Sequence, residues 1–142
     1  MSDTLDDLHA QAGLALLRAD AVLTVFDGKV PDQVVSGPGP VVPYALVYSE
    51  VAWPRDGAGN TLQGTALTAT VTWTCHCVGL TAQAARVVQG RVRAALLNQR
   101  PVIAGRSCGL IKQDEVLPPN PDESTGRLVM DAVSTYSMIS TP

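Results

Sequence analysis

An alternation of residue types over residues 65–78 constrains the fold of this chain more than any other feature. Every second position carries threonine and the positions between carry apolar side chains: Thr68, Thr70, Thr72 and Thr74 form one series, and Leu67, Ala69, Val71, Trp73 and Cys75 form the other. A period of two is that of a β-strand, whose side chains point alternately to the two faces of a sheet. Threonine is β-branched and suits a pleated, half-exposed surface. The segment therefore predicts a strand with one face in the core and the other face open.

Two helices are predicted from apolar residues at three- and four-residue spacing. The first begins at Ser2 or Asp3 and ends near Asp20, with an apolar stripe of Leu5, Leu8, Ala12, Ala15, Leu16 and Ala19 that Leu14 and Leu17 widen. The second begins at Thr81, a favourable N-cap residue, and runs to about Asn98. Its buried stripe is Ala85, Val88, Val92, Ala95 and Leu96, and its outward face is Gln83, Arg86, Gln89 and Arg93.

The remaining segments predict shorter strands joined by loops. Strands are expected at residues 22–26, 44–52, 102–103, 108–116 and 127–139, and loops at 36–40 and 117–126, where proline and glycine gather. Residues 53–64, with one proline and three glycines, predict a flexible hairpin arm. The expected fold is a single α+β domain over residues 1–142, with a mostly antiparallel sheet and two helices packed on one face.

The composition indicates a folded subunit with a lean core. Hydrophobic residues make up 46% of the 142 residues and charged residues 16%, a balance that argues against disorder. Aromatic residues make up only 4%, so the core must consist mainly of Val, Leu and Ala, and contacts between subunits would stabilise it further. The net charge of −3 gives no general attraction to nucleic acid or to anionic membranes. No apolar run reaches the roughly 20 residues that a transmembrane helix needs.

The sequence Cys75-His76-Cys77 is the first candidate for a metal site. On a strand, alternation puts both sulfur atoms on one face and His76 on the other, whereas structural zinc needs four converging ligands. The third cysteine, Cys108, is distant in sequence, and an odd number of cysteines does not form a disulfide framework. We interpret the three cysteines as small buried apolar side chains in a protein made in a reducing cytoplasm, and we predict no metal site.

Residues for catalysis do not converge in this sequence. His9 lies on the first predicted helix, where we expect it to face solvent, and nothing in the sequence brings it to a cysteine. No serine lies in a Gly-x-Ser-x-Gly elbow, and no glycine-rich segment is followed by the lysine and helix of a phosphate loop. We therefore predict no catalytic residues, no cofactor and no enzymatic activity.

Four residues are candidates for a contact with a partner protein. Arg86 and Arg93 lie seven positions apart and share one helix face, within a group of arginines at positions 86, 91, 93 and 100. The group is either a solvated face or a surface for a negative partner, such as passing DNA. Trp53 and Arg55 open the glycine-rich segment, and a tryptophan there either packs on its own sheet or is buried by a partner.

The order of these segments resembles the tail terminator proteins of long-tailed bacteriophages. The residues that carry the resemblance are Val-Phe-Asp-Gly-x-Val-Pro at 25–31, Pro43-Tyr44 at the start of a strand, Gly79-Leu80 before a helix that ends in Ala95-Leu96-Leu97, and Asp131-Ala-Val-Ser-Thr-Tyr136-Ser. They span most of the chain, although each motif is short. The sequence departs from commoner members in its Gly-Pro-Gly-Pro segment at 37–40 and in its proline-rich loop at 118–121.

The resemblance implies a structural role in a virion. Proteins of that family have an α+β fold and close into hexameric rings that cap the tail tube and present a surface to the neck. The implied partners are further copies of this chain, the tail tube protein and a head-completion protein, with DNA passing through the lumen. The protein would be made in the host cytoplasm and reside in the tail or neck of the virion. Other phage neck or minor tail proteins, such as a head-closure protein, stay possible, as does a small cytosolic enzyme or binding module.

Overall fold

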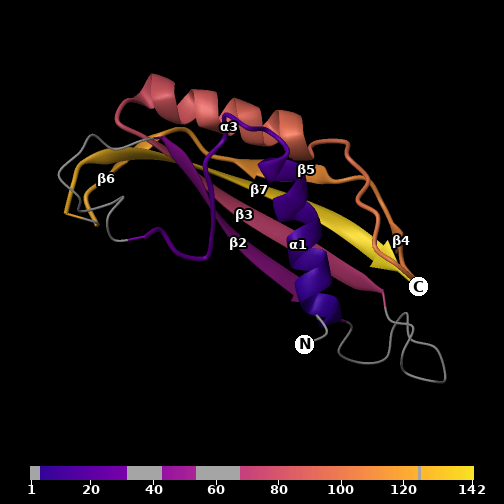
Figure 1. The fold of residues 1–142 in the computed structure, drawn as a ribbon. Coiled ribbons are helices and arrows are strands. Elements are labelled where there is room, and N and C mark those ends of the chain that lie inside the picture. The colour runs from indigo at the N-terminus through magenta and orange to yellow at the C-terminus, as the bar shows by residue number, and fades with distance from the viewer. Residues whose placement is uncertain (1–3, 32–42, 54–67, 125) are drawn as a thin grey trace.

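The computed structural model describes residues 4–31, 43–53, 68–124 and 126–142. In these ranges the chain forms two helices and one seven-stranded sheet (Figure 1). The elements are α1 (Leu5–Arg18), β1 (Val25–Asp27), β2 (Tyr44–Ala52), β3 (Ala69–Gly79), α3 (Ala82–Leu96), β4 (Ser107–Cys108), β5 (Lys112–Val116), β6 (Asn120–Asp122) and β7 (Val129–Thr141). The α+β fold expected from the sequence is confirmed.

The sheet is mixed rather than purely antiparallel. Its strands run in the order β1-β2-β3-β7-β4, and β5 and β6 also pair with β7. The short strand β1 pairs with β2 in parallel, while each of the other pairings is antiparallel. Strand β7 therefore lies at the centre of the architecture, since β3, β4, β5 and β6 all pair with it. The Gly-Pro-Gly-Pro segment lies outside the described residues.

The alternation that predicted the central strand is present in β3. Ala69, Val71, Trp73 and Cys75 are fully buried, whereas Thr70 on the other face is exposed. Both helices lie against the buried face, where α3 packs on β3 and β7, and α1 packs on β2, β3 and α3 (Figure 1). The expectation of two helices on one face of the sheet is therefore confirmed, although residues 65–67 lie outside the described part of the chain.

Helix α3 forms as its sequence predicts. The Thr81 hydroxyl accepts a hydrogen bond from the Ala84 N–H at 3.1 Å and so caps the first turn. The side chains of Ala85, Val88, Val92 and Leu96 are buried in the main core. The helix ends at Leu96, slightly before the predicted end, and Asn98 then adopts a left-handed conformation with a φ of 62°.

Helix α1 buries only part of the predicted stripe. Leu14 and Leu17, which widen the stripe, are in the core, and Ala12 and Leu16 pack against it. The cap of the helix is Thr4, and its buried residues are His9, Gly13, Leu14 and Leu17, while Leu8 and Ala15 of the predicted stripe are exposed. The cause is the large Trp73 side chain, whose Nε1 donates a hydrogen bond to the Ala10 carbonyl at 3.3 Å. A Cβ atom at Gly13 would lie 2.3 Å from the Trp73 ring, so only glycine admits this approach.

The expectation that His9 faces solvent is wrong. Its side chain is fully buried between α1 and the end of β7. The ring Nδ1 donates to the Leu5 carbonyl at 2.7 Å, and Nε2 is hydrogen-bonded to the Ser140 hydroxyl at 2.8 Å. Arg106 donates from Nε to the same hydroxyl at 3.0 Å. Because a buried polar group is costly only when it is unpaired, this network lets a histidine occupy a core position.

Three predictions for the C-terminal half need correction. Residues 102–103 form no strand, because the Arg106 N–H donates to the Ile103 carbonyl and turns the chain there. The predicted strand 108–116 is divided into β4 and β5, since Ile111 exchanges backbone hydrogen bonds with the segment after α3. The predicted loop 117–126 contains β6, which pairs with β7. Its Pro121 is tolerated because β6 is an edge strand.

Candidate assembly interface

The face of the sheet opposite the helices is open. We define the open face by its outward side chains, which are Tyr48, Glu50, Thr70, Thr72, Thr74, Thr135, Ser137 and Ile139. The register places Thr74 between Tyr48 of β2 and Thr135 of β7, so hydroxyl groups stand side by side across three strands. No helix among the described residues covers this face, and Tyr48 and Ile139 are 47% and 57% exposed. It is a mainly polar surface with scattered apolar groups.

A hollow of about 390 Å³ lies at one end of this face, beside β1 and β6. We call it the acidic hollow, and its polar and aromatic lining consists of Lys29, Tyr44, Tyr48, His76, Asp122 and Asp131. His76 Nδ1 lies 2.8 Å from Asp131 Oδ2, and the Tyr48 ring meets the His76 ring edge-on, with centroids 5.6 Å apart. Strands β2, β3 and β7 position these groups, because their alternation sends them away from the helices.

The surroundings in the hollow shift the pKa values of two of its side chains, His76 and Asp122. The hydrogen bond to Asp131 raises the pKa of His76 above its usual value, and burial opposes this effect only in part. The N–H of Ser124, which donates to Asp122 Oδ1 at 2.8 Å, lowers the pKa of that carboxyl. Asp131 Oδ1 is buried and has no hydrogen-bond partner in the described part of the chain. Two carboxylates among aromatic rings favour a cationic group.

The same hollow lacks the arrangement of a hydrolytic site. A His–Asp pair becomes a general base when a nucleophile is hydrogen-bonded to the second ring nitrogen. Ser124 lines the hollow, but its hydroxyl is hydrogen-bonded to Asp122. Across the described residues, the only hydrogen bond that positions His76 is the one to Asp131. The geometry supports the binding of a charged group more than catalysis.

The cysteines lie where the strand pattern predicted. Cys75 and Cys77 are buried on the helix-covered face, His76 points the other way, and Cys108 is a third buried free thiol. Burial raises the pKa of Cys75, and it raises that of Cys77 to about 12. Both thiols are therefore protonated and poor nucleophiles at neutral pH. Within the described ranges, no group of three or more potential ligands is placed to hold a metal ion.

The pair formed by Ser140 and His9 also has the spacing of a nucleophile and a base. Both side chains have no solvent-exposed area, however, and the Arg106 guanidinium donates to Ser140 as well. A substrate has no access to an atom that the packed core encloses. We therefore assign this pair a structural role, in which it ties the start of α1 to the end of β7.

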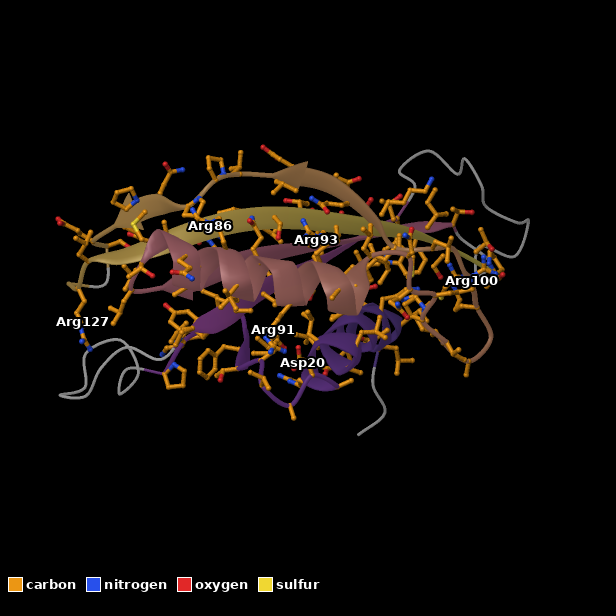
Figure 2. All side chains as sticks on the ribbon, turned by 90° about the horizontal axis from the view of Figure 1, so that it is seen from above. Asp20, Arg86, Arg91, Arg93, Arg100 and Arg127 are labelled. Carbon is orange, nitrogen blue, oxygen red and sulfur yellow. The ribbon has the colours of Figure 1, made fainter. Side chains whose placement is uncertain are left out.

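The structure divides the arginine group into three parts (Figure 2). Arg86 and Arg93 project from one flank of α3 and are exposed, as the sequence predicted. Arg91 points to the other flank, where its Nη1 lies 2.9 Å and 3.2 Å from the two carboxylate oxygens of Asp20. This contact lowers the pKa of Asp20. Arg100 lies at the far end of the molecule, so it does not extend the surface of Arg86 and Arg93 (Figure 2).

Trp53 contacts its own chain and is half-buried. Its Nε1 donates to Asp6 Oδ1 at 2.8 Å, its ring meets His9 edge-on with centroids 6.0 Å apart, and the Arg106 guanidinium lies 5.4 Å from the ring centroid. The remaining exposed part still allows the predicted contact with a partner. Arg55 and the rest of the predicted hairpin arm, residues 54–64, lie outside the described residues.

The acidic hollow was not found from the sequence. Tyr44, Tyr48 and His76 all occupy alternate positions whose side chains point away from the helices. This alternation is visible in the sequence. Asp131 joins them only through the register in which it lies opposite Val78, and Asp122 joins through β6. Such pairings between distant segments are not encoded by local periodicity.

Comparisons with known proteins show the fold but no family. No family model matches this sequence, and no curated protein matches it. A chain of a solved structure described as the virion of a native gene transfer agent particle has a similar fold, with a TM-score of 0.68. The two chains are 19% identical, and the match covers 99% of this chain and 100% of the other. In the described residues, no helix is long and apolar enough to cross a membrane.

Proposed function

We propose that this protein is a structural subunit of a phage-like virion, and that it is a tail terminator. In this role it closes into a hexameric ring that caps the tail tube and joins it to the neck. The observation that carries the proposal is the fold similarity to a chain of a gene transfer agent virion, which extends over the whole of both chains. The series of motifs at 25–31, 43–44, 79–97 and 131–137 supports the more specific assignment to the tail terminators.

The surfaces of the subunit support assembly into a ring. A ring needs two different patches on each subunit that meet when the rotation closes. The open face with its acidic hollow lies on one side of the sheet, and the exposed arginines of α3 lie on the other. Contacts through both patches would bury additional surface and so stabilise a subunit whose core contains few aromatic residues.

The partners follow from this role. They are further copies of this chain, a tail tube protein and a head-completion protein of the neck, and DNA passes through the lumen of the ring. The protein is made in the host cytoplasm and resides in the virion tail or neck, with no membrane contact. It uses no cofactor, metal or catalytic residue, and Trp53, Arg55, Arg86 and Arg93 contribute to its interfaces.

A second function, that of another neck or minor tail protein such as a head-closure protein, fits the same fold. The fold similarity to a chain of a gene transfer agent virion supports it as well, because it indicates a virion component and does not distinguish the tail from the neck. A small enzyme or binding module has less support, because the acidic hollow holds a His–Asp pair with no nucleophile in contact among the described residues.

Electron microscopy tests the proposal at two levels. The purified protein, imaged in negative stain alone and with tail tubes, is expected to form rings or to assemble into them on tube ends. A strict monomer that never binds tubes contradicts the proposal. In lysates lacking the gene, overlong or headless tails are expected for a terminator, whereas leaking heads with normal tails would identify a head-closure protein.

A further inference from the structure

The acidic hollow presents two carboxylates that the described residues pair only in part. Asp131 uses Oδ2 to accept from His76, while Oδ1 is buried and has no hydrogen-bond partner among the described residues. Because Oδ1 is enclosed, a donor from outside the subunit would meet the second carboxylate of the hollow, which is only partly buried. The second carboxylate, Asp122, accepts a hydrogen bond from the Ser124 N–H and also lines the hollow.

The aromatic rings of the hollow indicate which kind of cationic side chain would bind there. Tyr48 and His76 stand edge-to-face, and the exposed Tyr48 ring forms part of the wall. A guanidinium group is planar, donates to carboxylates in a fixed fork and stacks on aromatic faces, whereas an ammonium is a compact point charge. Lys29 and His76 also line the hollow, so its two carboxylates leave a net negative charge when His76 is neutral. The site suits an arginine side chain.

Arginines without an acidic partner lie on the opposite side of the same subunit. Helix α3 carries three arginines and no acidic residue. Arg91 is paired with Asp20, but Arg86 and Arg93 are exposed and form no ion pair with any residue that the structure describes. They project from the same flank of the helix, one after the other along its length (Figure 2).

The sheet separates these two features, so one copy cannot join its own arginines to its own hollow. We infer that the acidic hollow receives Arg86 or Arg93 from α3 of a second copy of this chain. The contact is head-to-tail, because the helix layer of one copy meets the open face of the next. It rests on the proposed ring and supplies its heterologous interface, with the donor and the acceptor on different faces of each subunit.

Charge reversal at the two sides of the contact tests this inference. The variant Arg86→Glu/Arg93→Glu removes the donor, and Asp122→Lys reverses the acceptor; each is expected to weaken assembly by roughly tenfold or more. Arg100→Glu is the matched control, since it changes the same residue type at the far end of the molecule. The measurement is sedimentation velocity or native mass spectrometry over a range of concentrations, with circular dichroism to confirm folding.

Combination of the variants gives the decisive result. In the triple variant Arg86→Glu/Arg93→Glu/Asp122→Lys, each interface places glutamate against lysine, so assembly is expected to recover. A 1:1 mixture of the donor and acceptor variants is expected to assemble as well, with alternating copies. Asp131→Asn, which keeps the side-chain size, is a second acceptor variant if Asp122→Lys does not fold.

The outcomes separate this inference from the proposed function. Wild-type rings that persist in the donor and acceptor variants overturn the arginine contact and leave the ring in place. Folded variants that lose assembly without recovery in the triple variant also overturn it, because the hollow then serves another contact. A wild-type protein that neither forms rings nor binds tubes contradicts the proposed function itself.

Discussion

The two faces of the sheet are built from alternate residues of the same strands, yet one face is buried under the helices and the other is exposed. On the covered face, Trp73, Tyr136 and Val71 have no exposed surface and are enclosed by α1 and α3. On the open face, Tyr48 and Ile139 keep about half of their surface exposed between rows of threonine. Side chains on the covered face are constrained by the volume that they must fill. Those on the open face are free of this packing constraint, so polar and half-exposed side chains are tolerated there.

The largest difference between the faces is expected from deletion of the central tryptophan. Trp73→Ala removes the largest buried side chain and leaves a cavity under both helices, so the free energy of unfolding should fall by about 3–5 kcal/mol. Thr70→Ser, on the open face of the same strand, should change it by about 0.5 kcal/mol or less. Urea denaturation of both variants measures the difference. Equal losses would show that the open face is also a core surface.

Two glycine substitutions compare a packed helix face with an open one. Gly13→Ala forces a methyl group against the Trp73 ring and should destabilise the subunit by about 1–3 kcal/mol. Gly90→Ala on α3 meets no atom within 4 Å and should stabilise by about 0.5–1 kcal/mol, because alanine favours the helix. Thermal unfolding gives both values. A neutral Gly13→Ala would show that α1 moves easily on the sheet.

The His76–Asp131 pair should make the open face sensitive to pH. Because the pKa of His76 is raised in the folded protein, the stabilisation is fully present below the ordinary value of 6.5. It is lost as the pH rises through the raised pKa. The variant His76→Gln should therefore cost about 1 kcal/mol of unfolding free energy in mildly acidic buffer and close to nothing in alkaline buffer. A loss that is the same at both pH values would assign His76 a packing role only.

A small effect on subunit stability, with a larger one on assembly, is expected at the rim of the hollow. Tyr48→Thr replaces one residue that favours strands by another and removes a half-exposed ring that contacts His76, so the free energy of unfolding should change by about 0.5 kcal/mol. Ring formation, measured by sedimentation velocity, should weaken more than this value alone accounts for. Unchanged assembly would place Tyr48 outside the interface between copies.

The sequence predicted those parts of the fold in which local periodicity decides the outcome. The alternation of β3 and the stripe of Ala85, Val88 and Val92 on α3 are both present as expected. The face of α1 was predicted only in part: Leu14 and Leu17 are buried as expected, but the burial of Gly13 and His9 was missed. Sequence periodicity measures hydrophobicity and does not register a close approach such as that of Gly13 to the Trp73 ring.

The candidate site depended on pairings that local sequence does not encode. The outward position of His76 was predicted, but its partner Asp131 lies 55 positions away and is brought to it by the register of β3 and β7. Strand β6 was missed because Pro121 argues against a strand, although an edge strand tolerates it. The arginine group was divided because Arg91 and Arg100 point away from the flank that carries Arg86 and Arg93.

The central place of β7 has a consequence for when the protein becomes active in assembly. Four strands pair with β7, and all of them precede it in the chain, so the ribosome makes their common partner last. Until then, β3 lacks one neighbour and the short strands β4, β5 and β6 have none among the described strands. Folding dominated by such distant pairings is slow and late. Newly made subunits are therefore expected to stay incompetent for association until synthesis has passed β7.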